Sequence, residues 1–373
     1  MSDPNAVRPV LLVAGARPNF MKVAPIVAEL ERRDIPTVLL HTGQHYSTQM
    51  SEAIFQDLGL RQPDYNLGIG SGSHAQQTAR VMEAFEPILL ETRPRWVVVV
   101  GDVNSTLACA LVASKLKEEV GCRIAHVEAG LRSGDWRMPE EVNRVLTDRL
   151  SDLLLTPSAD ALPNLLAEGI PGDRIAFVGN VMIDSLFAQL ERARALDVPS
   201  RYGMQHGGYA VATLHRPSNV DSPEVLQAIV HGLRRVAEAM PVVLPMHPRT
   251  RRNAEAFGLE GELEKFTVLE PLGYLEMLGL TEGCAVMLTD SGGLQEETTA
   301  LGIPCVTLRE QTERPATITH GTNRMAPWPL TAEGIVASFE AGRAQGRSAP
   351  GARCPDGWDG RTARRIVDRL GAF

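Results

Sequence analysis

Short runs of apolar residues alternate with longer amphipathic stretches along almost the whole chain. Each run is unbroken rather than alternating with polar residues, as expected for strands of a parallel sheet that is covered on both faces. The stretches between the runs have helical length and period, for example at 21–33, 106–119 and 140–151. This β-α-β rhythm predicts an α/β protein with doubly wound sheets. The runs predict strands at 7–15, 37–43, 96–102, 123–130, 152–158, 174–180, 209–215, 241–247, 266–271, 284–290 and 304–309.

The runs fall into two groups, which predicts two doubly wound, Rossmann-like domains. A chain of 373 residues is long enough for two cores of ordinary size. We expect the first domain at 1–185 and the second at 186–358, because a helix and a connector with proline and glycine (198–208) separate the groups. The amphipathic tail at 359–373 is expected to pack on the first domain.

Composition and charge exclude several classes of protein. Hydrophobic residues make up 44% of the chain and charged residues 22%, which is typical of a soluble globular protein. The formal net charge of −8 argues against a broad nucleic-acid surface but leaves room for one basic pocket. The chain shows no secretory signal and no apolar run of about 20 residues, so we expect a cytoplasmic protein without a membrane partner. Its five cysteines include no C-x-x-C pair and are expected to be reduced.

A glycine-rich segment, GIGSGS at 68–73, superficially resembles a dinucleotide-binding loop. Ser73 occupies the position of the third glycine, and the segment does not follow the first strand, where such a loop belongs. We therefore predict an ordinary glycine loop and no nicotinamide cofactor.

Polar residues gather where the predicted strands of the first domain end, which is where open α/β sheets bind their ligands. Arg17 and Lys22 follow the first strand and suit a phosphate at a helix start, although both could instead lie on a solvated loop. Asp102 and Glu128 end two later strands, and Glu141 lies in the first turn of a helix. Clustered carboxylates raise one another's pKa, so these three acids predict acid–base chemistry.

Basic residues follow the first two strands of the second domain. His215 and Arg216 come after one strand and His247 after the next, which predicts an anion site. A metal site fits less well, because the nearby acids are not at ligand spacing. No metal is expected.

The segment TDSGGLQEE at 289–297 is the sharpest feature of the second domain. Its strand runs through Ser291, Gly292 and Gly293 directly into a helix, so backbone amides would face an anion without obstruction by a side chain. Glu297 could accept hydrogen bonds from ribose hydroxyls, and Arg314 in a later loop is another phosphate candidate. Together the two domains predict a nucleotide-sugar enzyme with its active site in the cleft between them. These residues alone leave the reaction open.

Nine motifs in this order resemble the non-hydrolysing UDP-N-acetylglucosamine 2-epimerase family almost from end to end. The resemblance implies two Rossmann-like domains of the glycosyltransferase-B type, a homodimer, and no nicotinamide or metal. It also implies an enzyme of cell-surface polysaccharide biosynthesis. The motifs are GARPNFMK, HTGQHY, GDVNSTLA, HVEAGLRS, PEEVNR, GNVMID, HRPSNVD, TDSGGLQEE and TERPATITHGTNR.

The resemblance further implies the reaction and the role of each matched residue. UDP leaves C1 in an anti elimination as C2 loses its proton, giving 2-acetamidoglucal, and UDP adds back as C2 is protonated on the opposite face. UDP-N-acetylglucosamine thereby becomes UDP-N-acetylmannosamine. Asp102, Glu128 and Glu141 match the acid–base carboxylates. The residues that match contacts to UDP or the substrate are Arg17, Lys22, His215, Arg216, Ser291, Gly292, Gly293, Glu297 and Arg314.

Three alternatives stay open within and beyond this family. HTGQHY and GSGSHA also resemble the branch that acts on UDP-2,3-diacetamido-glucuronic acid, and hydrolysing relatives release free N-acetylmannosamine. A glycosyltransferase on the same fold is an alternative of another class, which the three carboxylates disfavour. Gln44, Arg216 and His247 match an allosteric site of some members, but Ser47 and Ser73 stand where larger hydrogen-bonding residues occur. We therefore expect no allosteric activation.

Overall fold

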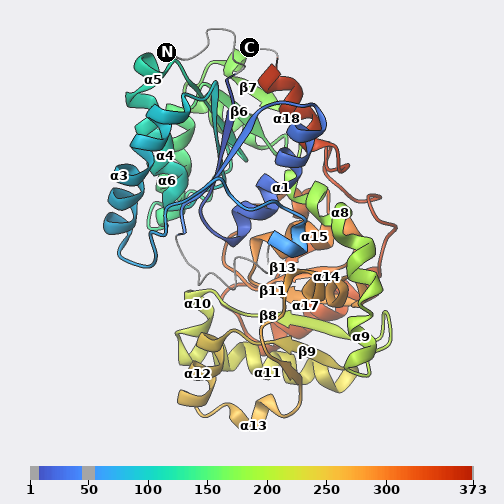
Figure 1. The fold of residues 1–373 in the computed structure, drawn as a ribbon. Coiled ribbons are helices and arrows are strands. Elements are labelled where there is room, and N and C mark those ends of the chain that lie inside the picture. The colour runs from blue at the N-terminus through green and yellow to red at the C-terminus, as the bar shows by residue number, and fades with distance from the viewer. Residues whose placement is uncertain (1–7, 44–54, 372–373) are drawn as a thin grey trace. The chain divides into compact units, whose positions relative to one another are not determined.

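The computed structural model describes residues 8–43 and 55–371, except for the side chain of Arg17. The chain forms two compact units (Figure 1). The first contains the described residues up to Ser185 and those from Asp356 onward, and the second is Leu186–Pro355. Within the described residues each unit holds one parallel sheet surrounded by helices. The predicted fold class, α/β with two doubly wound sheets, is confirmed.

The sheet of the first unit reverses its winding direction between β1 and β4. Val10 of β1 lies between Thr37 of β2 and Trp96 of β4, so the chain winds outward on both sides of β1. Ligands of open α/β sheets bind at the carboxyl ends of the strands beside such a reversal. Among the described residues the strand order is β3 (Tyr65–Asn66), β2 (Thr37–His41), β1 (Val10–Ala14), β4 (Trp96–Val100), β5 (Arg123–Val127), β6 (Leu153–Thr156) and β7 (Ile175–Phe177).

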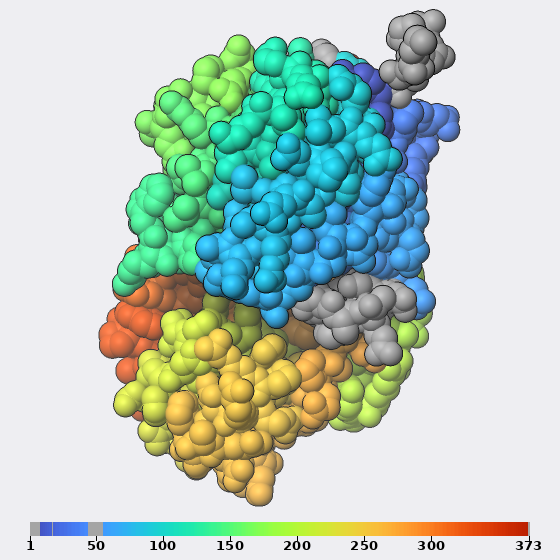
Figure 2. Space-filling view, turned by 60° about the vertical axis from the view of Figure 1, so that its left-hand side comes forward, coloured from blue at the N-terminus to red at the C-terminus, as the bar shows by residue number. Residues whose placement is uncertain are grey.

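The helix α3 of the first unit begins with a capping box. The Ser73 hydroxyl accepts a hydrogen bond from the Gln76 amide (3.3 Å), and the Gln76 side chain accepts one from the Ser73 amide (3.1 Å). Figure 2 shows the face of the unit on which α3 lies, in light blue. Among the described residues the helices of this unit are α1 (Arg17–Arg32), α3 (His74–Thr92), α4 (Asn104–Lys115), α5 (Lys117–Val120), α6 (Pro139–Leu150), α7 (Ala161–Ala167), a 3-10 turn at Gly172–Arg174, and α18 (Thr362–Gly371).

The last described helix, α18, packs against α1 of the first unit. Asp368 on α18 forms an ion pair with Arg33 (2.6 Å), and the Leu370 carbonyl accepts a hydrogen bond from Trp96 Nε1 (3.0 Å). The backbone N–H of Ala363 donates to Asp184 (2.7 Å). These contacts attach the end of the chain to the body formed by its beginning.

The second unit repeats the doubly wound plan. Among the described residues its strand order is β10 (Thr267–Leu269), β9 (Val242–Pro245), β8 (Ala210–Thr213), β11 (Val286–Thr289), β12 (Cys305–Thr307) and β13 (Asn323–Met325). The helix α8 (Val181–Ala195) contains the boundary between the units. The remaining helices are α9 (Val198–Arg201), α10 (Pro217–Val220), α11 (Pro223–Ala239), α12 (Pro248–Ala256), α13 (Glu260–Leu263), α14 (Tyr274–Gly283), α15 (Gly292–Leu301), α16 (Pro315–Thr319) and α17 (Ala332–Gln345).

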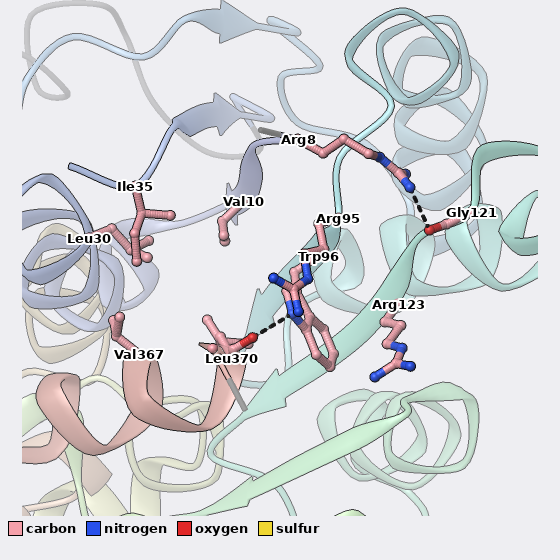
Figure 3. A pocket seen from close by; sticks show the side chains of 11 residues that line it. Arg8, Val10, Leu30, Ile35, Arg95, Trp96, Gly121, Arg123, Val367 and Leu370 are labelled. Carbon is pink, nitrogen blue, oxygen red and sulfur yellow. Dashed lines mark hydrogen bonds between the residues drawn. The ribbon is translucent and has the colours of Figure 1, made fainter. Parts of the chain in front are cut away.

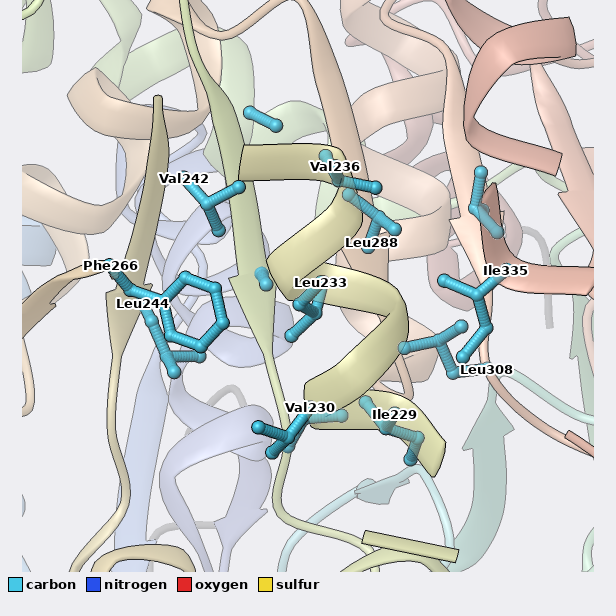
Figure 4. Packing of buried hydrophobic residues seen from close by; sticks show 14 of the residues in the cluster. Ile229, Val230, Leu233, Val236, Val242, Leu244, Phe266, Leu288, Leu308 and Ile335 are labelled. Carbon is cyan, nitrogen blue, oxygen red and sulfur yellow. The ribbon is translucent and has the colours of Figure 1, made fainter. Parts of the chain in front are cut away.

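The core of the second unit forms where α11 packs on the sheet. Leu233 and Val236 of α11 meet Leu244 and Leu288 of the strands, and all four side chains are buried (Figure 4). Burying a side chain of this size contributes about 1.5–3 kcal/mol each. Such apolar faces hold the strands and so fix the loops that follow their carboxyl ends.

All eleven strands predicted from apolar runs are present, and the part of the chain that is described holds two further strands that were not predicted. The missed strands, β3 and β13, are short and lie at sheet edges. Polar residues such as Asn66 and Asn323 interrupt them, so their sequences carry no apolar run. GIGSGS forms a loop between β3 and α3, as predicted. Within the described part of the chain, no helix has the length and apolarity needed to cross a membrane.

A cavity of about 550 Å³ opens at the amino-terminal ends of β1, β4 and β5 (Figure 3). Val10, Trp96 and Arg123, the first residues of these strands, line it together with Arg8. Four backbone carbonyls accept hydrogen bonds from the Arg8 guanidinium, which ties it to the scaffold. The cavity lies at the amino-terminal end of the sheet, whereas the predicted site residues of the first unit follow the carboxyl ends of its strands.

Candidate active site

The carboxyl ends of β1, β4 and β5 bring four of the predicted residues together in the first unit. Asp102 lies two residues after β4, Glu128 directly follows β5, and Glu141 is in the first turn of α6. Lys22 reaches the same place from α1. Ion pairs hold all four side chains.

Lys22 and Glu128 form a buried ion pair. Lys22 Nζ contacts Glu128 Oε2, and the two side chains are 8% and 6% exposed. Gly101 makes room for this pair, since an added Cβ would lie 2.9 Å from Lys22 Nζ and 3.5 Å from Glu128 Oε2. Gly101 also has a φ of +65°, which favours glycine. This glycine is therefore required both by the backbone and by the ion pair.

The backbone of Glu128 is strained. Its φ of +74° lies in the left-handed region, which residues other than glycine rarely adopt. The amides of Glu128 and Ala129 both donate to the Leu155 carbonyl, at 3.0 and 3.1 Å, and so hold this conformation. Strained residues that their surroundings hold in place occur often at functional sites. This observation marks Glu128 independently of its charge.

Arg144 bridges the other two carboxylates. Its Nη2 lies 2.7 Å from Asp102 Oδ2, and its Nη1 lies 2.7 Å from Glu141 Oε2. The Arg144 side chain is only 5% exposed. Our sequence analysis did not single out Arg144, although it stands three residues after Glu141 and therefore on the same side of α6.

The pKa of Glu141 departs from the sequence-based expectation. Burial raises its pKa, but hydrogen bonds from the Ser133 and Gly134 amides and the charge of Arg144 outweigh burial and lower it below the usual value. The prediction that clustering raises the pKa is therefore wrong for Glu141. The reason is that its carboxylate faces a guanidinium and backbone donors.

The second unit builds a different arrangement around Asp290, at the carboxyl end of β11. Asp290 is fully buried and accepts hydrogen bonds from the amides of His215 and Arg216. His215 Nδ1 also lies 2.7 Å from Asp290 Oδ1. Burial raises the pKa of Asp290, but the hydrogen bonds and charge of His215 outweigh it and lower the pKa. Asp290, which our sequence analysis did not select, thus fixes the predicted His215-Arg216 pair.

Ser291, Gly292 and Gly293 start the helix α15 next to this aspartate. Ser291 makes no side-chain cap, so its hydroxyl does not occupy the amides of the first turn. An added Cβ at Gly293 would meet no atom closer than 4.0 Å. The amides and the positive end of a ten-residue helix are suited to an anion such as phosphate.

Three arginines and two glutamates form a charged cluster beside α15. Glu313 is buried and pairs with Arg309 (2.8 Å) and Arg216 (3.6 Å), while Arg314 pairs with Glu296 (2.7 Å). Burial raises the pKa of Glu313, but the charges of the three arginines outweigh it and lower the pKa to about 2. These three guanidinium groups outnumber the two carboxylates they pair with, which suits a phosphorylated ligand.

The remaining predicted residues are placed as follows. Glu297 is buried within α15, and His247 caps α12 by accepting a hydrogen bond from the Arg249 amide (3.2 Å). Gln44 lies outside the described residues, and so does the side chain of Arg17. In the part of the chain that is described, no group of three His, Cys, Asp or Glu side chains is arranged to hold a metal ion.

A family model described as UDP-N-acetylglucosamine 2-epimerase matches residues 28–371. The chain belongs to this family. A UDP-N-acetylglucosamine 2-epimerase of Methanococcus maripaludis is 43% identical over 323 residues, which are 84% of this chain and 87% of the relative. A UDP-2,3-diacetamido-2,3-dideoxy-D-glucuronate 2-epimerase of Pseudomonas aeruginosa is 45% identical over 318 residues, 84% of this chain and 87% of the relative.

A solved structure supports the same assignment. The crystal structure of Methanocaldococcus jannaschii UDP-GlcNAc 2-epimerase in complex with UDP-GlcNAc and UDP matches with a TM-score of 0.86 and 40% identity. The match covers 98% of this chain and 100% of that chain. The family resemblance inferred from the nine motifs is thereby confirmed, and with it the assignment of the chain to the isomerases.

Proposed function

We propose that this epimerase interconverts UDP-N-acetylglucosamine and UDP-N-acetylmannosamine by inverting C2 of the sugar. The observation that carries the proposal is the cluster of Asp102, Glu128 and Glu141, held by Lys22 and Arg144 at the carboxyl end of one sheet. Inversion at C2 needs a group that removes a proton from one face and a group that delivers one to the other. A cluster of three carboxylic acids can supply both.

The proposed reaction breaks the C2–H and C1–O bonds and forms a C1–C2 double bond. UDP leaves with the electron pair of the C1–O bond, and the acceptor of the C2 proton is one of the three carboxylates. In the return step UDP oxygen attacks C1 while C2 takes a proton on its other face. Lys22 places a positive charge against Glu128, and Arg144 favours the ionised form of Glu141.

The leaving group carries two phosphates, so its departure requires positive charge and backbone donors. We assign this role in the second unit to the amides of 291–293, to the His215-Arg216 pair held by Asp290, and to Arg314. Glu297 is assigned to the ribose. In the first unit we assign Arg17 to the same ligand, and Lys22 to the substrate beside Glu128.

A second substrate is favoured by one observation. The Pseudomonas aeruginosa relative, which is 45% identical, is named for UDP-2,3-diacetamido-2,3-dideoxy-D-glucuronate. Measuring kcat/KM for both UDP-sugars distinguishes the two proposals. We expect the value for UDP-N-acetylglucosamine to be at least about 10-fold higher, a ratio that differences in a few pocket contacts can produce. A ratio of this size in the opposite direction would assign the chain to the diacetamido-glucuronate branch.

The wider setting belongs to the same proposal. We place the enzyme in the cytoplasm as a homodimer that supplies an activated sugar for cell-surface polysaccharides. The family resemblance supports each of these points. Two residues at positions that match the allosteric site of some family members have structural partners of their own, since Ser73 caps α3 and His247 caps α12. This supports an enzyme that works without a second UDP-N-acetylglucosamine as activator.

A further inference from the structure

A buried histidine and aspartate lie next to the candidate carboxylates and have no part in the proposed reaction. His126 is on β5 and Asp148 is on α6, and both are 0% exposed. His126 Nδ1 lies 2.6 Å from Asp148 Oδ1, and Nε2 lies 2.8 Å from the carbonyl oxygen of Gly101. Both ring nitrogens therefore face oxygen atoms.

The pair binds two separate stretches of backbone. The Gly101 carbonyl can only accept, so Nε2 of His126 donates to it. Asp148 Oδ2 accepts a hydrogen bond from the Gly130 amide (3.0 Å) and lies 2.8 Å from Arg132 Nη2. Asp148 thus uses one carboxylate oxygen for His126 and the other for the backbone and Arg132.

The partners of Asp148 favour its ionised form. Burial raises its pKa, but its interactions with His126 and Arg132 outweigh burial and lower the pKa below the usual value. Arg132 also pairs with Glu168 (2.7 Å). Asp148 is thus held by the ring of His126, a guanidinium and a backbone donor.

The pair joins the two backbone segments that carry catalytic candidates. Gly101, whose carbonyl binds His126, directly precedes Asp102. Gly130, whose amide binds Asp148, follows Glu128 by two residues. Gly101, Glu128 and Gly130 all have positive φ, at +65°, +74° and +81°. A conformation of this cost persists only where surrounding contacts enforce it.

We propose that His126 and Asp148 are positioning residues: the ring of His126, anchored on Asp148, holds the backbone that carries Asp102 and Glu128. The effect on turnover rests on the proposed function, whereas the effect on this backbone does not. The first test is therefore spectroscopic. The second compares two variants of Asp148.

The backbone is followed by ¹H–¹⁵N NMR of the amides of Asp102 and Glu128 in the wild-type protein and in Asp148→Ala. We expect these two signals to move in the variant, while amide signals of the second unit keep their wild-type positions. Unchanged signals of Asp102 and Glu128 in a folded Asp148→Ala variant would overturn the proposal. This measurement needs no activity.

Asp148→Asn and Asp148→Ala separate positioning from bulk stability. The asparagine amide group can donate to Nδ1 of His126 while its oxygen accepts from Gly130 and Arg132, so these hydrogen bonds can be kept. Alanine removes these bonds. We expect Asp148→Asn to keep at least about a tenth of kcat and Asp148→Ala to lose at least about 100-fold, with KM nearly unchanged, because small misplacements of catalytic groups slow the chemical step.

The outcomes distinguish this inference from the proposed function. Equal losses of kcat in both variants, or wild-type kcat in Asp148→Ala measured well below its unfolding temperature, would overturn the positioning role. A purely structural role would lower thermal stability and leave kcat unchanged. If the wild-type protein does not epimerise its substrate, the proposed function fails, while the NMR result still decides whether the pair holds this backbone.

Discussion

Replacement of Glu128 by glutamine is expected to lower kcat by at least about 100-fold while the fold stays intact, as is typical for loss of an acid–base group. Glutamine has nearly the same shape and can still accept a hydrogen bond from Lys22. It cannot take up a proton from C2 or return one. The initial rate of epimerisation at saturating UDP-N-acetylglucosamine measures the effect, and circular dichroism checks the fold. Asp102→Asn and Glu141→Gln are expected to behave alike.

Glu140→Gln is the matched control, since Glu140 neighbours Glu141 in the first turn of α6. Its charge is expected to interact with the helix dipole, so the variant should stay within about threefold of wild-type kcat. Wild-type turnover in two of the three carboxylate variants would contradict the assignment of the cluster to acid–base chemistry. A loss in Glu140→Gln as large as in Glu141→Gln would show that the assay reports damage to α6.

Arg144→Met is expected to destabilise the protein by about 3–5 kcal/mol, the range for breaking a buried ion pair by removing one partner. Arg144 pairs with both Asp102 and Glu141, and the side chain of Glu141 is only 2% exposed. Without the guanidinium the buried carboxylate of Glu141 keeps its charge but loses its ion-pair partner. Denaturant unfolding near neutral pH measures the difference in unfolding free energy. Turnover should also fall, because Arg144 orients two catalytic candidates.

The pH dependence of this difference provides a further check. The pKa of Glu141 is lowered in the folded protein, so the stability from its ionised form is fully present above the unfolded pKa of about 4.3. It is lost as the pH falls through the lower, folded value. The stability gap between wild type and Arg144→Met should therefore narrow in acid. Arg144→Lys keeps one charge but not the bridge, and should lie between the two. Equal stability of wild type and Arg144→Met near neutral pH would contradict the account.

Much of the fold follows from the sequence because its strands are buried on both faces. Trp96–Val100 is apolar at every position and buried at every position, so the run identifies the strand. Asn323–Met325 is a strand through edge pairing with β12, and its polar residues give no such signal. Strand ends likewise located Asp102 and Glu128, since parallel strands present their carboxyl ends together.

The partners of the site residues did not follow from the sequence. Lys22 and Glu128 are 106 positions apart, and Arg144 and Asp102 are 42 positions apart, so no local spacing indicates either pair. His126 lies within an apolar run, and its partner Asp148 is 22 positions away, so the sequence gives no sign of their contact. Asp290 carries its role through contacts to the backbone of His215 and Arg216, which a motif of side chains does not display.

The central claim is that the carboxylate cluster removes and returns the proton at C2, and NMR of UDP-N-acetylglucosamine incubated with the enzyme in D2O tests it most directly. The account predicts UDP-N-acetylmannosamine that carries solvent deuterium at C2, because carboxylic acids exchange their protons with solvent. The same exchange should be lost in Glu128→Gln. A substrate that keeps its C2 proton and forms no UDP-N-acetylmannosamine would contradict the account, as would free N-acetylmannosamine as the sole product.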